Sequence, residues 1–341
     1  MGILRCCGVA VVAVVIVIAL AWAYGALHFD GPSKALAMVQ VVAILAVFIF
    51  VKRWCRKLSI FGLWFAIVLA WWLSLKPTNV GDWQDDVAQL PWAEVDGDEV
   101  ILHNVRNCEY RTESNYTARW EDRTVRLSKI THVDMAICYW GSPWMAHPIL
   151  SFQFEDAPPL CFSIETRYKV GQSYSAIGGL YRQFELVYIA ADERDIIRVR
   201  TNYRKNEDVY LFRLTAGPAE CRERFREYVR SINALRDHPR WYNAITTNCT
   251  TAIRHQHPAA ERSRWDWRML VNGKGDELMY ERHNLVTDGL SFTELKQRAL
   301  INPTAKAAGD SPDFSALIRA GRPGMEVVKP AETDSAVKPD R

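Results

Sequence analysis

Three uncharged apolar runs at the start of the chain constrain its folding most. They cover residues 8–27, 35–51 and 58–75, and the second is the shortest. A helix of about 20 apolar residues crosses the hydrocarbon core of a bilayer. The first run is long for a signal peptide core, and two similar runs follow it directly. We therefore predict three retained transmembrane helices.

The charges beside these runs predict their orientation. The loop at residues 52–57 carries four Lys/Arg and no acid, whereas the loop at residues 28–34 has no net charge. Positive loops stay in the cytoplasm, so Arg5 and residues 52–57 are assigned to that side. Three crossings would then place everything after Lys76 outside. We expect a multi-pass protein of a bacterial inner (cytoplasmic) membrane, with a cytoplasmic N-terminus and a periplasmic C-terminal domain.

The charge balance also narrows the function. The formal net charge is +3, but residues 1–76 hold seven Lys/Arg and one acid, which leaves 35 basic and 38 acidic residues in the remainder. A balanced soluble part lacks the basic excess that nucleic-acid binding needs. We expect no nucleic acid among the partners.

Cysteine number leaves the redox state of the outer part open. Five cysteines follow Lys76, at positions 108, 138, 161, 221 and 249. An odd number means that at least one is outside any intramolecular disulfide. Two bridges with a free Cys249, or five reduced thiols, both fit.

The region after the apolar runs has the pattern of an α+β domain. Strand-like segments cover residues 100–105, 124–130, 135–140, 149–154, 160–165, 184–190, 196–201 and 209–214. An amphipathic helix is predicted over residues 218–236 and a second, shorter helix over residues 249–257. We divide the chain into a membrane anchor (1–76), an extracytoplasmic catalytic domain (77–302) and a tail (303–341). The composition of the tail predicts that it is largely disordered.

Cys249 is the strongest candidate for chemistry. It directly follows Asn248 at the predicted start of a helix, where the helix dipole favours the thiolate. His147, at the start of a strand-like segment, is the best base, and Glu165 is the best carboxylate to orient its ring. The three form a predicted catalytic set of nucleophile, base and orienting acid.

Other assignments remain open from the residues alone. His132 is an alternative base, and Asp134 and Asp156 are alternative orienting acids. His255 and His257 are badly spaced from Cys249 for contact on one helix, and we interpret them as surface residues. A buried structural thiol is the alternative for Cys249. Cysteines and histidines lack the paired spacing of a zinc site, and no phosphate-binding loop occurs, so we expect no metal and no cofactor.

The order His147, Glu165, Asn248-Cys249 resembles the circularly permuted papain-like group, which includes NlpC-type and lecithin–retinol acyltransferase-like enzymes. In that group a histidine strand comes before a polar residue, and an Asn-Cys helix start comes last. The resemblance implies an antiparallel sheet packed with the helix that bears the nucleophile.

A closer resemblance covers about residues 96–320, which look like the Lnb N-terminal periplasmic domain family. The matching stretches are residues 104–107, 132–141, 147–154, 163–167, 179–183, 192–195, 242–243, 247–251 and 314–315. The named member of the family is implicated in N-acylation of bacterial lipoproteins through a cysteine. The resemblance therefore implies that Cys249 is the nucleophile and His147 the base, whereas the role of Glu165 is our own inference.

These observations favour a membrane-bound thiol acyltransferase that forms a thioester. A membrane lipid would be the acyl donor and a lipoprotein N-terminus the acceptor. Trp140, Trp144, Met145 and Phe152, around His147, would line an acyl groove or belong to the core. The alternatives are a cysteine hydrolase of the cell envelope, acting as peptidase or amidase, and a non-enzymatic envelope scaffold.

Overall fold

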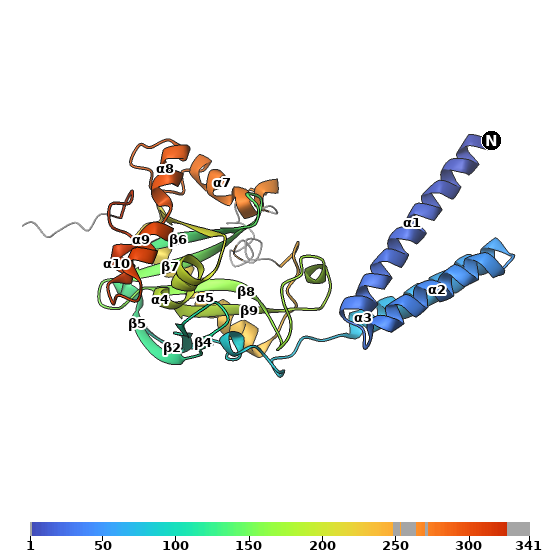
Figure 1. Ribbon diagram of the computed structural model, residues 1–341, viewed down its shortest axis with the longest axis horizontal. Coiled ribbons are helices and arrows are strands. Elements are labelled where there is room, and N and C mark those ends of the chain that lie inside the picture. Colours follow the sequence, from blue (N-terminus) through green and yellow to red (C-terminus); the bar gives the residue numbers. More distant parts are fainter. Residues whose placement is uncertain (1, 248–252, 254–263, 270–271, 326–341) are drawn as a thin grey trace, which may run out of the picture. The chain divides into compact units, whose positions relative to one another are not determined.

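The structure, a computed structural model, describes residues 2–247, 253, 264–269 and 272–325 (Figure 1). The chain divides into two compact units. The anchor unit comprises Met1–Leu90, Ile164–Tyr188 and Asn233–His255, and the sheet unit comprises Pro91–Ser163, Ile189–Ile232 and Gln256–Arg341. The membrane anchor is thus joined by two later segments that the sequence assigned to the catalytic domain.

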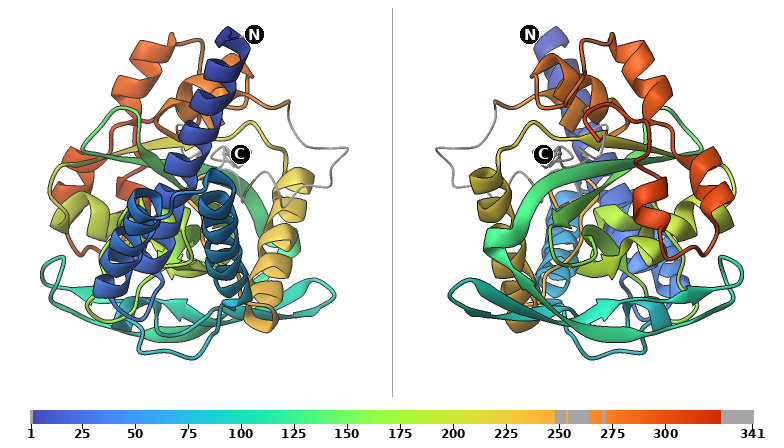
Figure 2. Two further views of the ribbon diagram at one scale, coloured as in Figure 1. Left: turned by 90° about the vertical axis from the view of Figure 1, so that its right-hand side faces the viewer. Right: turned by 90° about the vertical axis from the view of Figure 1, so that its left-hand side faces the viewer.

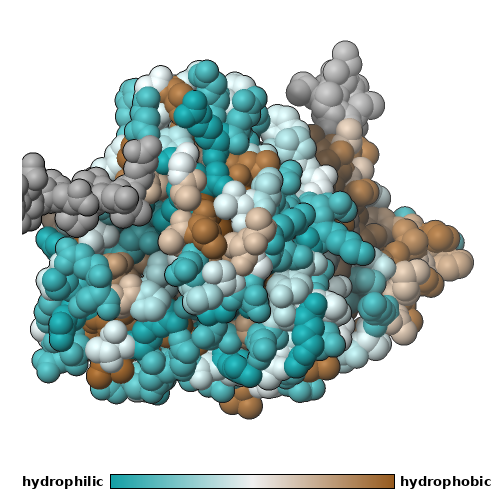
Figure 3. All heavy atoms as spheres, turned by 60° about the vertical axis from the view of Figure 1, so that its left-hand side comes forward, coloured by the Kyte–Doolittle hydropathy of each residue, from teal (hydrophilic) through white to brown (hydrophobic). Residues whose placement is uncertain are grey.

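The anchor unit begins with three helices, α1 (Gly2–Phe29), α2 (Lys34–Phe50) and α3 (Trp54–Ser74). Among the described residues, two segments are long and apolar enough to cross a membrane, Gly8–Phe29 and Trp54–Ser74. The 17 residues of α2 extend only about 25 Å, less than the core thickness of about 30 Å. The prediction of three spanning helices is therefore corrected: two helices are candidate spans by length, and α2 is a shorter apolar helix between them. Hydrophobic residues dominate the surface of these helices, coloured brown in Figure 3.

Helices α1 and α3 run in the same direction. Trp22 of α1 makes edge contacts with both Phe65 and Trp72 of α3, and Asp30, directly after α1, accepts a 2.8 Å hydrogen bond from the indole of Trp72. Late residues of α1 thus meet the middle and late residues of α3. Helix α2 leads the chain back between them. The carboxyl ends of α1 and α3 therefore lie at the same end of this group of helices.

An eight-stranded sheet forms the core of the rest of the chain. Its order is β1-β2-β9-β8-β7-β6-β10, with β5 paired to β2. The strands are β1 (Trp92–Asp96), β2 (Glu99–Arg106), β5 (Trp120–Arg126), β6 (Ile130–Trp140), β7 (Ala146–Phe154), β8 (Leu160–Arg167), β9 (Glu185–Asp192) and β10 (Glu207–Arg213). A separate hairpin joins β3 (Glu109–Tyr110) and β4 (Tyr116–Thr117). The registers of β6, β7, β8 and β10 are antiparallel, as expected.

The two faces of the sheet differ in chemistry because strand side chains alternate. On one face, Phe152 and Phe162 pack edge-on against Phe225 of α5 (Pro218–Asp237). All three rings are fully buried. On the other face lie α4 (Glu193–Arg198), α9 (Asn302–Ala308) and α10 (Phe314–Leu317). Both views of Figure 2 show α5 and the α9–α10 pair on opposite sides of the sheet.

Short helices complete the described chain. They are η1 (Asp85–Val87), η2 (Leu127–Lys129), η3 (Gly178–Leu180), η4 (Val199–Tyr203), η5 (Trp267–Met269), η6 (Asn272–Lys274), α7 (Gly275–Glu281) and α8 (Phe292–Ala299). The helix predicted over residues 249–257 falls almost wholly outside the described residues. The permuted papain-like arrangement therefore stays a prediction, whereas the α+β class is confirmed.

Two further predictions, both about local structure, are wrong. Residues 196–201, predicted as a strand, belong to α4 and η4, because the side chain of Asp192 caps the amino end of α4 by accepting a hydrogen bond from the backbone N–H of Arg194. Residues 303–325, assigned to a disordered tail, form α9 and α10, and both Phe314 and Ile318 are fully buried. The composition of this segment led to the wrong prediction because a few buried side chains are enough to hold it in the folded domain.

We predict that Phe225→Ala lowers the free energy of unfolding by about 3–5 kcal/mol, because it leaves a cavity among packed aromatic rings. Chemical denaturation of the full chain would measure the change. Arg226→Ala, at the exposed neighbouring position, should change stability by no more than about 0.5 kcal/mol. Equal losses for both variants would contradict the packing of α5 on the sheet.

Candidate functional site

His147 is a buried residue at the start of β7. It is paired in register with Cys138 of β6, and its Nε2 lies 2.6 Å from the hydroxyl oxygen of Ser163 on β8. Ser163 pairs with Ile149, two residues beyond His147, so the histidine and the serine share one face of the sheet. The hydrogen bond holds the imidazole ring in one orientation, which a general base requires.

Ser163 was not among the site residues predicted from the sequence. The signal that points to it is the alternation of side chains on β8, since Ser163 lies two residues before the predicted orienting acid Glu165. Glu165 is half-buried and belongs to the anchor unit, whereas His147 belongs to the sheet unit. A pair between Glu165 and His147 stays a prediction, and Ser163 is the observed partner of the ring.

The alternative acids are placed away from His147. Asp134 pairs in register with Ser151, four residues along β7 from His147, which is about 13 Å at the rise of a strand. Asp156 follows the carboxyl end of β7, the end opposite His147, and forms a surface ion pair with Arg126. Both alternatives for the orienting acid are therefore wrong.

The alternative base is also remote from this position. His132 pairs with Gln153 near the carboxyl end of β7. Burial, with a contribution from Arg213, lowers the pKa of its imidazole. His132 therefore cannot replace His147 beside Ser163.

Cys249, the predicted nucleophile, lies outside the described residues, as do Asn248, His255 and His257. The segment directly before it is described. The side-chain oxygen of Asn243 accepts hydrogen bonds from the backbone N–H groups of Ile245 and Thr246. The backbone N–H of Thr247 donates a hydrogen bond to the carbonyl of Asn243. This turn fixes the chain to within two residues of Cys249.

The four cysteines of the sheet unit, at positions 108, 138, 161 and 221, are not disulfide-bonded. Two bridges with a free Cys249 would require all four to be paired, so that alternative is wrong. Burial, reinforced by Glu193, raises the pKa of the Cys161 thiol well above its ordinary value, and burial also raises that of Cys221. These two thiols are poor nucleophiles.

The predicted acyl groove is only partly supported. Phe152 is fully buried on the α5 side of the sheet, opposite the face of His147, so its assignment to a groove is wrong. Trp144 and Met145, in the loop before His147, are 50% and 40% exposed. The backbone of Trp144 is fixed by a hydrogen bond from the N–H of Gly273. An exposed apolar pair thus stands two to three residues from the histidine.

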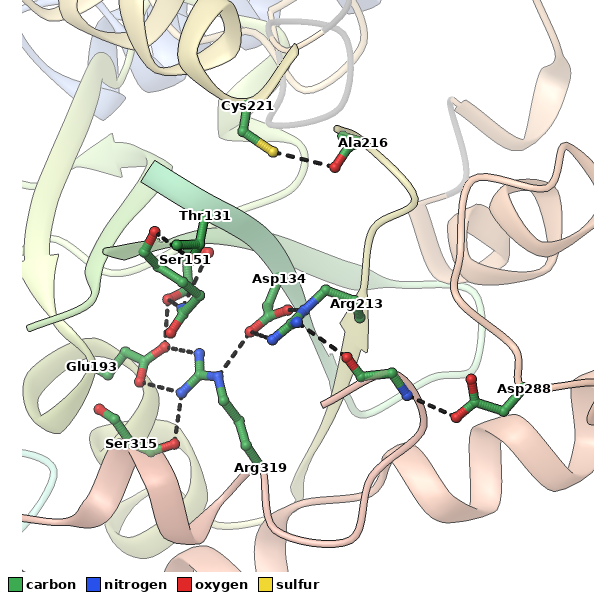
Figure 4. A network of polar contacts seen from close by, with 12 residues as sticks. Thr131, Asp134, Ser151, Glu193, Arg213, Ala216, Cys221, Asp288, Ser315 and Arg319 are labelled. Atoms are coloured by element: carbon green, nitrogen blue, oxygen red, sulfur yellow. Dashed lines mark hydrogen bonds and ion pairs between the residues drawn. The ribbon is translucent and has the colours of Figure 1, made fainter. Parts of the chain in front are cut away.

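Farther along the same sheet face, a buried ion network surrounds Arg319 (Figure 4). Its guanidinium donates to Asp134 of β6, to Glu193 of α4 and to the carbonyl of Ser315. Asp134 also accepts from Arg213 of β10. Burial alone would raise the pKa of Glu193, but Arg319 overrides burial and holds that pKa below its ordinary value. The network gives Asp134 a structural role, as a partner of Arg213 and Arg319.

A second buried ion pair lies on β2. Arg106 binds both carboxylate oxygens of Asp195, which also accepts the backbone N–H of Cys108. Arg106, Glu193 and Asp195 belong to stretches on which the family resemblance was based. Those stretches therefore contain residues that hold α4 to the sheet, beside those proposed for chemistry.

Comparison with known proteins agrees with the family resemblance. Residues 116–273 match the sequence model of the family described as Lnb N-terminal periplasmic domain. The matched range includes His147, Ser163, Glu165 and Cys249 and is narrower than the resemblance over about residues 96–320. No curated protein and no solved structure matches the chain.

We predict that Arg319→Met lowers the free energy of unfolding by about 3–5 kcal/mol, because it leaves buried carboxylates without their shared cation. Denaturation of the full chain would measure this. The control is Lys129→Ala, which removes an exposed ion pair with Glu155 and should cost no more than about 1 kcal/mol. A loss of no more than about 1 kcal/mol for Arg319→Met as well would show that the network does not hold the last helices.

Proposed function

Because residues 116–273 of this chain are an Lnb N-terminal periplasmic domain, we propose that the protein is a membrane-bound, periplasm-facing cysteine acyltransferase. It takes an acyl group from a membrane lipid and transfers it to an amine, of which the N-terminus of a lipoprotein is the leading candidate. The domain family and the two apolar helices indicate a membrane-anchored protein with a periplasmic domain. Placement in the inner membrane is part of the proposal.

The observation that carries the proposal is the buried pair of His147 and Ser163. A histidine fixed by a 2.6 Å hydrogen bond has the restricted orientation that a base needs when it removes a proton from a thiol. Trp144 and Met145, exposed just before it in the chain, offer apolar surface to an acyl chain. These features support acyl chemistry on a lipid substrate.

In the first half-reaction, Sγ of Cys249 attacks the carbonyl carbon of a lipid ester. His147 takes the thiol proton and returns it to the leaving alcohol oxygen, so that a thioester and a lysolipid result. Ser163 acts through His147, since its hydroxyl keeps the ring in place during both proton transfers. Glu165 remains the proposed acid for orienting the ring.

In the second half-reaction, a neutral amine attacks the thioester carbonyl. An amide bond forms, the C–S bond breaks, and the proton of the amine passes through His147 to the departing thiolate. A thioester reacts readily with amines, which suits N-acylation. If water takes the place of the amine, the same site becomes a hydrolase.

We predict that Cys249→Ser abolishes covalent labelling by a thiol-reactive lipid probe and removes N-acylation of lipoproteins in cells. Mass spectrometry of lipoprotein N-termini, with and without the protein, would measure acyl transfer. The matched control is Cys221→Ser, at a buried thiol, which should keep both properties. Unchanged acylation with altered cell-wall peptides would favour the hydrolase, and unchanged labelling would favour a scaffold.

We predict that Ser163→Ala lowers the rate of acyl transfer about 10- to 100-fold, the kinetic equivalent of losing a hydrogen-bond partner worth about 1–3 kcal/mol. Ser163→Thr keeps the hydroxyl and should retain most of the rate. The pH–rate profile should also change in Ser163→Ala, because the partner of the titrating imidazole is gone. Equal rates for the alanine and threonine variants would exclude a role for the hydroxyl.

A further inference from the structure

Within the anchor unit, one loop binds the ends of two membrane helices. A single guanidinium nitrogen of Arg182 donates to the backbone carbonyls of Trp72, Leu73 and Leu75, at 2.7, 3.0 and 2.6 Å. The guanidinium also lies over the indole ring of Trp72, 4.2 Å from its centre. These carbonyls lie at the end of α3, where that of Trp72 also accepts the backbone N–H of Leu75, so Arg182 caps the helix.

The same loop binds the end of α1. The backbone N–H of Arg182 donates to the carboxylate of Asp30 at 2.9 Å, the carboxylate that also accepts the indole N–H of Trp72. The ring of Tyr181 stacks on Phe29, with centres 5.3 Å apart. Its hydroxyl lies so close to Gly25 that a side chain there would collide with it. We call these contacts of Tyr181 and Arg182 the clasp.

The clasp is joined to the segment that precedes Cys249. The backbone N–H of Ala244 donates to the carbonyl of Gly179 at 2.7 Å, and the side chain of Asn243 donates to the carbonyl of Leu180. Gly179 packs against Tyr242 and Ala244, each 3.3 Å from where its own Cβ would be. Residues 177–182 and 242–247 therefore form one surface.

That surface exposes aliphatic side chains. Ile177, Leu180 and Ile245 are 63%, 40% and 54% exposed, and we call these three residues the apolar patch. Leu180 is the residue directly before Tyr181. The patch thus continues from the carboxyl ends of α1 and α3, the point where both helices leave the membrane.

We propose that the apolar patch lies in the interfacial layer of the periplasmic leaflet and contacts lipid. Its partner is the lipid surface because the clasp ties it to the ends of membrane-crossing helices, and because Trp72, an amphipathic ring suited to that layer, is part of the clasp. The free energy falls when apolar side chains leave water for the boundary between headgroups and acyl chains. The clasp holds them there.

The patch has a consequence for the site, which rests on the proposed function. Cys249 follows Ile245 by four residues, so its Cα lies within about 14 Å of that of Ile245 whatever path the chain takes. A patch seated in the lipid interface therefore keeps the nucleophile within reach of an ester near the headgroup. The acyl donor is in this case a lipid still in the bilayer.

The test uses the full chain in nanodiscs of phosphatidylethanolamine and phosphatidylglycerol. The photoreactive residue benzoylphenylalanine is placed at Ile177 or Ile245, with exposed Ile67 of α3 as the membrane control and exposed Val95 of β1 as the comparison. Phospholipid adducts are counted by mass spectrometry. We expect adducts at Ile177 and Ile245 in yields near that at Ile67 and at least about tenfold above that at Val95.

Yields at Ile177 and Ile245 no higher than at Val95 would overturn the proposal, as would cross-links to a second copy in place of lipid. Arg182→Ala should reduce the lipid adducts at Ile177 several-fold, whereas Arg126→Ala, at an exposed arginine of β5, should leave them unchanged. Equal yields in both arginine variants would overturn the role of the clasp.

The same samples separate this inference from the proposed function. Cys249→Ser should keep every lipid adduct while it loses N-acylation. Adducts at the patch without any acyl transfer by the wild-type chain would refute the acyltransferase and leave the patch in place. Acyl transfer without adducts at the patch would refute the patch and leave the acyltransferase in place.

Discussion

Arg319 is the cation on which the polar face of the sheet depends. Asp134 and Glu193 are fully buried carboxylates, and two negative charges cannot stay ionised in the interior unless a cation lies between them. Arg319 supplies it and reaches both. Because it comes from the end of the described chain, the last helices must be docked before this face is electrically balanced. The fold is therefore closed by its final segment.

This arrangement also places the ion network and the proposed catalytic histidine at different positions on one sheet face. The ionic cluster occupies the part of β7 around Ser151, while His147 lies four residues away with a neutral partner, Ser163. About 13 Å of strand therefore separates the buried carboxylates from the histidine of the proposed site.

The sequence was most informative where its pattern was periodic. The helix predicted at residues 218–236 and most strand predictions agree with the structure, since alternation and the 3.6-residue period report burial directly. The prediction at residues 196–201 was wrong because β-branched residues also occur in a helix that Asp192 caps. The predicted number of helices long enough to span was too high because α2 is apolar but short.

The site itself was predictable only in part. The position of His147 at a strand start followed from the sequence, but its partner did not. Ser163 lies 16 residues away in the chain and meets His147 only through the register of β7 and β8, which one sequence does not specify. Asp134 was a reasonable acid by residue type, and only the distant Arg213 and Arg319 reveal its other use. Long-range pairing was the missing information in each case.

The family-matching stretches are best understood as three separate physical tasks. His147 and Ser163 serve the proposed chemistry, Arg106, Glu193 and Asp195 hold α4 to the sheet, and residues 179–183 with 242–243 build the clasp. The third task is performed within the anchor unit, at the ends of α1 and α3. Strand β8 carries Ser163, and the chain then continues through Tyr181 and Arg182 to the helix ends. For the proposed contact with lipid, hydrogen bonds to helix-end carbonyls set the height of the apolar patch more precisely than a flexible linker does.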